Sequence, residues 1–163
     1  MDCLLDAVRD HLRVKLELKP SECDVTPDGK PNPMAWQRFL AVHPGNMTNQ
    51  SVHAIDGRFS CKVTATVRTA AAPRDRKRDG GAWAIAEQIL VAVHMDYDLT
   101  ARAAALSANV EFVEPLCFES ANYQGPVGAD WFWSEGVDDD AAGIAIELSF
   151  GRARLIRYIA ESV

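Results

Sequence analysis

The sequence predicts an α+β protein, a single domain in which helices pack on one face of a mixed or antiparallel sheet. Residues 59–68 and 144–150 alternate apolar and polar side chains with the period of a half-buried strand. Residues 2–16 and 82–94 repeat apolar side chains with the period of a helix. Amphipathic helices commonly cover the apolar face of such a sheet, which gives the predicted class.

The size and composition are those of one folded domain over residues 1–163. The chain is 48% hydrophobic and 25% charged, and no linker or internal repeat divides it. Its net charge of −6 argues against broad binding to a phosphate backbone, because such binding needs a basic face. The N-terminal segment lacks the basic leader of a signal peptide, and no apolar run approaches the roughly 18 residues that span a bilayer. We therefore expect a protein that is made and used inside a cell, with no membrane partner.

The N-terminal segment 2–16 is predicted to be helical, with Asp2 as its N-cap and Pro20 closing it. Residues 20–33 are rich in turn-forming residues, and a short extended piece is expected at 23–25. Aromatic content favours a strand over 34–43 that stops at Pro44 and Gly45, followed by a polar loop.

The clearest strand, 59–68, directs one set of side chains to the core and another to a polar face. Phe59, Cys61, Val63, Ala65 and Val67 form the first set, and Ser60, Lys62, Thr64, Thr66 and Arg68 form the second. The charged segment 74–79 follows, and its last residue, Asp79, is a candidate cap for the next helix. In helix 82–94 the apolar stripe that includes Trp83 is wide, which indicates burial on more than one face.

The C-terminal third carries weaker signals. An alanine-rich piece leads to a strand expected to end at Pro115. The stretch 119–141 is expected to be a long irregular loop, which is often functional. The final strand begins near 144 and is expected to continue through Arg152 and Arg154.

The four cysteines are Cys3, Cys23, Cys61 and Cys117. They show neither a C-x-x-C pair nor the spacing of a metal site, so we expect them to be reduced and structural. A buried disulfide or a zinc site is the alternative. His94, Asp96 and Asp98 alternate at a helix end, which suits a helix terminus better than a metal site.

Catalysis has little support in this sequence. The nucleophile-elbow, zinc-protease and P-loop motifs are absent, so no catalytic residue, cofactor or metal is predicted. Gly80 and Gly81 before a helix are a weak signal for an anion site, and Asp79 beside them would repel a phosphate.

Three features are candidates for partner contacts. The basic residues Arg74, Arg76, Lys77 and Arg78 are interspersed with acids, which fits a solvated loop or a protein contact better than a nucleic-acid patch. Trp131 and Trp133 either cover the core or belong to a subunit interface. Asp138, Asp139 and Asp140 lack the spacing of a calcium loop and either form a solvated turn or pair with arginines of another subunit.

The segments "VTATVRTAAAPRDRKRDGGAWAIAEQILVAVH" and "AAGIAIELSFGRARL" resemble the tail terminator, or tail completion, proteins of long-tailed bacteriophages. The resemblance covers roughly residues 56–96 and 142–156, with support from helix 2–16, and it is one of size and element order. It implies a structural protein of the virion neck, assembled in the host cytoplasm. Such proteins form a ring, commonly a hexamer, that ends the tail tube and meets the head-side connector protein.

The resemblance also implies the partners and the contact residues. The partners are other copies of the chain, the tail tube protein and the connector, while DNA only passes through the lumen. Arg68 and the basic residues 74–78 would face a neighbouring subunit or the lumen, and the acidic residues 138–140 could meet the basic segment of the next copy. The alternatives are another head–tail joining component, or a small enzyme or ligand-binding domain with a pocket under 119–141.

Overall fold

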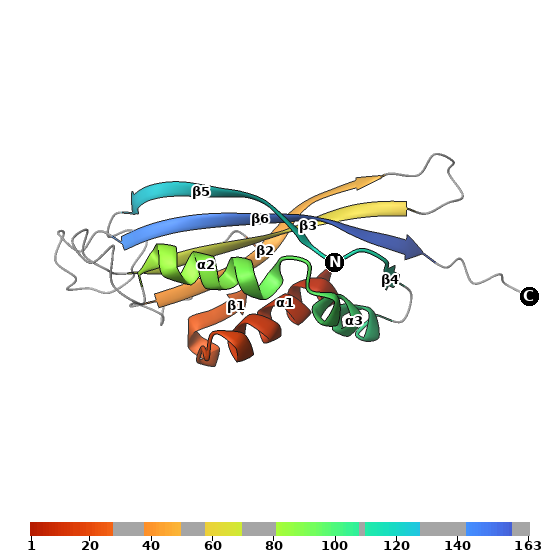
Figure 1. The fold of residues 1–163 in the computed structure, drawn as a ribbon, viewed down its shortest axis with the longest axis horizontal. Coiled ribbons are helices and arrows are strands. Elements are labelled where there is room, and N and C mark those ends of the chain that lie inside the picture. Colours follow the sequence, from red (N-terminus) through yellow and green to blue (C-terminus); the bar gives the residue numbers. More distant parts are fainter. Residues whose placement is uncertain (28–37, 50–57, 70–80, 108–109, 128–142, 158–163) are drawn as a thin grey trace, which may run out of the picture.

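The computed structural model describes residues 1–27, 38–49, 58–69, 81–107, 110–127 and 143–157. Within these ranges, three helices cover one face of a mixed six-stranded sheet, which confirms the predicted α+β class (Figure 1). The helices are α1 (Asp2–Lys15), α2 (Ala82–Val93) and α3 (Tyr97–Ala105), with a short 3₁₀ turn at Pro20–Glu22. The strands are β1 (Cys23–Val25), β2 (Arg38–Asn49), β3 (Arg58–Thr69), β4 (Val110–Phe112), β5 (Cys117–Val127) and β6 (Gly143–Arg157).

The last strand of the chain lies in the middle of the sheet. The order runs β1-β2-β3-β6, and β5 and β4 lie one after the other along the far edge of β6. Among the strands that the structure describes, only the β1–β2 pair is parallel. The pairing of β3 with β6 extends from Thr69 opposite Ile144 to Arg58 opposite Ile156, so the two best alternating segments of the sequence lie side by side.

The core lies between the sheet and the helices. Strands β3 and β6 contribute Val63, Ala65, Val67, Ile146, Leu148 and Phe150, all of which are buried. Helix α1 adds Leu4, Leu5, Val8 and Leu12, and α2 adds Ile85, Ala86, Ile89 and Val93. Every one of these apolar positions follows from the period of two in the strands and 3.6 in the helices.

The helix ends differ from the predictions. Asp2 lies in the first turn of α1, and Met1 occupies the cap position, so the prediction of Asp2 as N-cap was wrong. Helix α2 is preceded by Gly81, which supplies no side-chain cap; Asp79 lies outside the described residues. Trp83 is 44% exposed, so its assignment to the buried stripe of α2 was also wrong.

Three predicted strand boundaries were wrong as well. Strand β2 continues through Pro44 and Gly45 to Asn49, because a bulge between Pro44 and Met47 absorbs the turn-forming residues. A Cβ added at Gly45 would lie 2.7 Å from the Cβ of Lys62, so glycine is required by this close approach to β3. Strand β4 stops before Pro115, and residues 119–127 of the predicted loop belong to β5.

The core predicts a clear response to truncation at Phe150. Its ring is fully buried and contacts Phe118 edge-on, with centroids 6.0 Å apart. Replacing Phe150 with alanine removes this packing and should lower the free energy of unfolding by about 3–5 kcal/mol. Val113→Ala, at an exposed valine, should change it by less than about 0.5 kcal/mol. Urea denaturation of both variants measures the difference, and equal losses would contradict the assigned core.

Candidate functional site

Several strands begin or end together at one end of the sheet. Arg38, where β2 begins, is opposite Thr69, where β3 ends, and Thr69 is also opposite Ile144. Val127, the last residue of β5, is opposite Gly143, the first of β6. We call this the Thr69 end of the sheet; it is at the left in Figure 1. The chain segments 28–37, 70–80 and 128–142 all connect to it.

Nearly all of the predicted contact residues belong to two of these segments. Arg74, Arg76, Lys77 and Arg78 lie within 70–80, and Trp131, Trp133, Asp138, Asp139 and Asp140 lie within 128–142. These nine residues are outside the described ranges. Segment 70–80 nevertheless starts where β3 ends and leads into α2, and segment 128–142 runs from the end of β5 to the start of β6, so both are attached to the Thr69 end although they are far apart in the sequence.

Arg68 is the one predicted contact residue that the structure describes, and it is buried. It lies on the face of β3 away from the helices, between Phe39 of β2 and Ala145 of β6, and only 2% of it is exposed. A cation at this depth requires hydrogen-bonded or charged partners. The prediction that Arg68 lies on an exposed polar face was therefore wrong for the isolated chain: near the Thr69 end, both faces of the sheet are buried.

Farther from the Thr69 end, the same face carries polar pairs that connect neighbouring strands. His43 Nε2 lies 3.0 Å from Thr66 Oγ1, and Gln124 Nε2 donates to Glu147 Oε2 at 2.9 Å. Lys62 Nζ lies 2.6 Å from Glu119 Oε2, so this ion pair reaches from β3 across β6 to β5. A Cβ at Gly151 of β6 would collide with the Glu119 carboxylate, so a larger residue at this position would force the end of the Glu119 side chain to shift.

The residues after α2 form an elbow that ties the helices to β5. The backbone N–H of Phe118 donates to His94 Nδ1 at 2.9 Å, and the N–H of Met95 donates to the carbonyl of Leu116 at 2.8 Å. Met95 adopts the left-handed region, with φ of 57°, and so reverses the chain. Asp96 then caps α3, accepting from the N–H of Leu99 at 2.7 Å. His94 and Asp96 thus have separate structural partners, and the described residues contain no group of three His, Cys, Asp or Glu side chains that could hold a metal.

His11 joins α1 to this elbow. Its Nε2 lies 2.9 Å from the carbonyl of Ala92, to which it can only donate, and 3.4 Å from Asp96 Oδ2. The ring is buried, and its Nδ1 has no hydrogen-bond partner among the parts of the chain with described placement. One feature of the sequence indicates that His11 is buried, because it lies next to Leu12 on the apolar stripe of α1.

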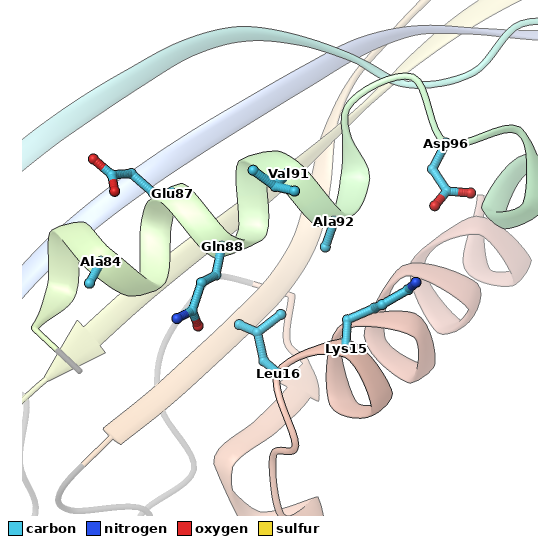
Figure 2. Close-up of a pocket in the computed structure, with 8 residues that line it drawn as sticks. All are labelled: Lys15, Leu16, Ala84, Glu87, Gln88, Val91, Ala92 and Asp96. Atoms are coloured by element: carbon cyan, nitrogen blue, oxygen red, sulfur yellow. The ribbon is translucent and has the colours of Figure 1, made fainter. Parts of the chain in front are cut away.

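A groove of about 590 Å³ runs between the C-terminal end of α1 and α2 (Figure 2). It is lined by Lys15, Leu16, Ala84, Glu87, Gln88, Val91, Ala92 and Asp96. Figure 2 shows Gln88 and Ala92 directed toward α1, with Glu87 and Val91 on the far rim of the groove. Sequence reasoning missed this groove, because the residues of α1 and α2 that line it are separated by about seventy positions. The groove is not the pocket predicted under residues 119–141. Residues 119–127 of that predicted loop belong to strand β5.

The cysteines are free, and two of them are deeply buried. Burial raises the pKa of the Cys23 thiol to about 12 and that of the Cys61 thiol to about 11. Cys3 and Cys117 are half-buried, and Cys117 Sγ lies 3.2 Å from Met95 Sδ.

Comparisons with known proteins add no family assignment. No protein-family model matches the chain, and no curated protein matches its sequence. Among the described residues, no helix is long and apolar enough to cross a membrane.

The thiols should separate into two reactivity classes. Thiolate is the reactive form, and a raised pKa keeps Cys23 and Cys61 neutral at pH 8. With Ellman's reagent at pH 8, we expect Cys3 and Cys117 to react in the folded protein, and Cys23 and Cys61 to react only after unfolding. Four thiols that react at one rate in the native protein would contradict the described burial.

The elbow predicts a specific effect at Asp96. Asp96→Ala removes the cap of α3 and the carboxylate beside His11, and should lower the free energy of unfolding by about 1–2 kcal/mol. Asp96→Asn keeps an oxygen for the cap and should retain most of that stability. Asp98→Ala, two residues further on in the first turn of α3, is the matched control. If Asp96→Ala and Asp98→Ala have the same free energy of unfolding, the cap does not stabilise the elbow.

Proposed function

We propose that this chain is a structural virion protein that forms a ring at the head-proximal end of a phage tail tube. There it ends tube polymerisation and joins the tail to the head connector, and it performs no catalysis. The observation that carries the proposal is that the two segments bearing the predicted contact residues, 70–80 and 128–142, connect to one end of the sheet.

Ring assembly explains why two unlike segments are needed. A ring of identical copies closes through head-to-tail contacts, so each copy must offer two different, complementary patches. Segment 70–80 carries four basic and two acidic residues, whereas 128–142 carries acidic residues and no basic one. Opposite charge favours the correct pairing and suppresses like-with-like contacts. In the proposed ring, the basic segment of one copy meets the acidic segment of the next.

The role of Arg68 in this proposal differs from the one expected from the sequence. Because Arg68 is buried between β2 and β6, its role in the proposed ring is to support the Thr69 end from within the sheet, and it does not contact a neighbouring copy. The tryptophans Trp131 and Trp133 remain candidates for the contact, since tryptophan is enriched at subunit interfaces.

The remaining partners follow from the position of such a ring. One surface meets the tail tube protein and another meets the connector protein, while DNA passes through the lumen without specific binding. The net charge of −6 supports this last point, because it gives little general attraction for a polyanion.

Charge reversal tests the ring contact directly. Arg76→Glu and Asp139→Arg should each weaken self-association by about tenfold, and the double variant should recover most of it because the pair is restored with opposite polarity. Sedimentation velocity at matched concentrations measures the association. Arg102→Glu, on the exposed surface of α3, is the control and should leave association unchanged.

Two negative outcomes have different meanings. If the single reversals leave the rings intact, segments 70–80 and 128–142 do not make the contact. If the chain remains monomeric both alone and when mixed with tail tubes, the proposed function itself fails.

A further inference from the structure

We propose that the outer edge of β5 pairs with β5 of a second copy of this chain. The two strands run antiparallel about a two-fold axis that is perpendicular to the sheet and passes between the two Asn122 residues. This contact goes beyond the proposed ring, because a two-fold contact joins two copies and cannot close a ring of six. Its centre is in the middle of β5, apart from the segments assigned to the ring contact, so it can be tested independently.

One side of β5 has no strand beside it in the described part of the chain. Strand β5 pairs with β6 alone, and Figure 1 shows it at the upper border of the sheet. The elbow covers the start of this border, since the N–H of Phe118 donates to His94 Nδ1. Residues 119–124 beyond it are all exposed, and none makes a backbone hydrogen bond to a described residue outside the β5–β6 pairing. A row of unpaired backbone N–H and C=O groups is matched by another extended strand.

The side of β5 that faces the helix layer carries an exposed aromatic pair. Tyr123 stacks on Trp83 of α2, with ring centroids 6.2 Å apart and an angle of 14° between the rings. Tyr123 is 41% exposed and Trp83 is 44% exposed. A strand added to β5 would place every second side chain on this side, next to the aromatic pair. Such a strand needs a small or apolar side chain opposite Tyr123, and polar side chains at the positions between.

Strand β5 itself meets these requirements. Tyr123 and Ala121 lie on the helix side, because they are opposite buried core residues of β6. Asn122, between them, lies on the other side of the sheet. A two-fold axis perpendicular to the sheet reverses the strand direction and keeps both helix layers on the same face. With Asn122 opposite Asn122 of the second copy, Tyr123 of each copy is opposite Ala121 of the other, so a large side chain meets a small one twice.

This register also suits the charges and the irregularities of β5. Glu119 is the one charged residue of the strand, and its carboxylate is bound by Lys62. In the proposed register Glu119 lies opposite Gly125 of the second copy, so like charges do not meet. The β5–β6 register shifts next to Glu119 and Gln124, so the regular stretch between these shifts is the part of the edge that offers an even row of backbone groups.

The neighbouring registers fit less well. Centring the pairing on Ala121 would place Tyr123 opposite Glu119, which is held on the other side of the sheet by its ion pair. Centring it on Tyr123 would bring Pro126, which has no N–H to donate, opposite a residue of the regular stretch. A shift by half of this amount would place the two helix layers on opposite faces, away from the aromatic pairs.

The first test places a cysteine on the proposed axis, in a Cys3→Ser, Cys117→Ser background that removes the two half-buried thiols. Only a residue on the axis lies opposite itself, with Cβ atoms about 5 Å apart. Asn122→Cys should therefore form a disulfide-linked dimer about tenfold faster than Gln124→Cys, whose two copies lie about 14 Å apart along the strands. Non-reducing gel electrophoresis over a time course of air oxidation measures both rates. Both positions are exposed, so a difference in rate reports the register rather than access.

The second test introduces a charge beside the axis. Lysine on an edge strand opposes pairing with another strand, so Ala121→Lys should weaken the association by about tenfold. Light scattering over a concentration series should give a largest species of twice the variant's mass in the wild type. Val113→Lys, at an exposed valine between β4 and β5, is the matched control and should keep the wild-type mass. Circular dichroism melting checks the fold, and Asn122→Cys keeps the inference testable if Ala121→Lys is unfolded.

Either test can overturn the pairing. Equal crosslinking rates for Asn122→Cys and Gln124→Cys contradict the two-fold axis, and so does an equal mass for the wild type and a folded Ala121→Lys. An edge that pairs with a strand of a different protein would give both of these results.

Failure of this inference is distinguishable from failure of the ring. Ala121→Lys should still cap tail tubes, because it leaves the Thr69 end unchanged. Loss of pairing together with loss of capping would mean that the edge of β5 belongs to the ring contact itself, which also overturns a separate two-fold contact. A wild type that pairs through β5 but does not cap tubes would overturn the ring alone.

Discussion

The register between β3 and β6 is the constraint on which the rest of the structure depends. These strands are about ninety residues apart in the sequence, and their pairing brings two alternating patterns into phase. If β6 slipped by one residue while Val67 of β3 kept its place in the core, Ile146 would turn away from the helices and Glu147 would be directed into the core. The same register brings the end of β3 next to the start of β6, and so creates the Thr69 end of the sheet.

The elbow after α2 fixes the three helices relative to one another, as the β3–β6 register fixes the strands. His94 and Met95 fasten it to β5 through the backbone of Phe118 and Leu116, and Asp96 starts α3 while contacting His11 of α1. A short polar sequence thus connects all three helices with an edge strand. Because it fixes α1 relative to α2, it also determines the width of the groove between them.

Local sequence patterns were sufficient to predict the central strands β3 and β6, but they failed to predict the edge strand β5 and the full length of β2. The alternation in 59–68 and 144–150 is strong because one face of each strand packs against the helices, and each segment lies within the strand that the structure describes. Strand β5 carries Glu119, Ser120, Asn122 and other exposed side chains, so it has no apolar period to detect, and its pairing comes entirely from β6. Pro44 and Gly45 resemble a turn in the sequence, but a bulge accommodates them within β2.

The candidate contact surfaces were only partly accessible to sequence reasoning. The charges of 70–80 and 128–142 are visible in the sequence, but their attachment to one end of the sheet follows from strand pairing. Arg68 has the alternation of a surface residue, and its burial results from both faces being covered near Phe39 and Ala145. The groove depends on helix packing, which no local pattern encodes.

The most direct measurement is electron microscopy of purified tail tubes incubated with this protein. The account predicts a closed ring of identical subunits at one end of each tube, and tubes that no longer lengthen when free tube protein is added. Bare tube ends and continued growth, with the protein remaining as single chains in the background, would contradict it.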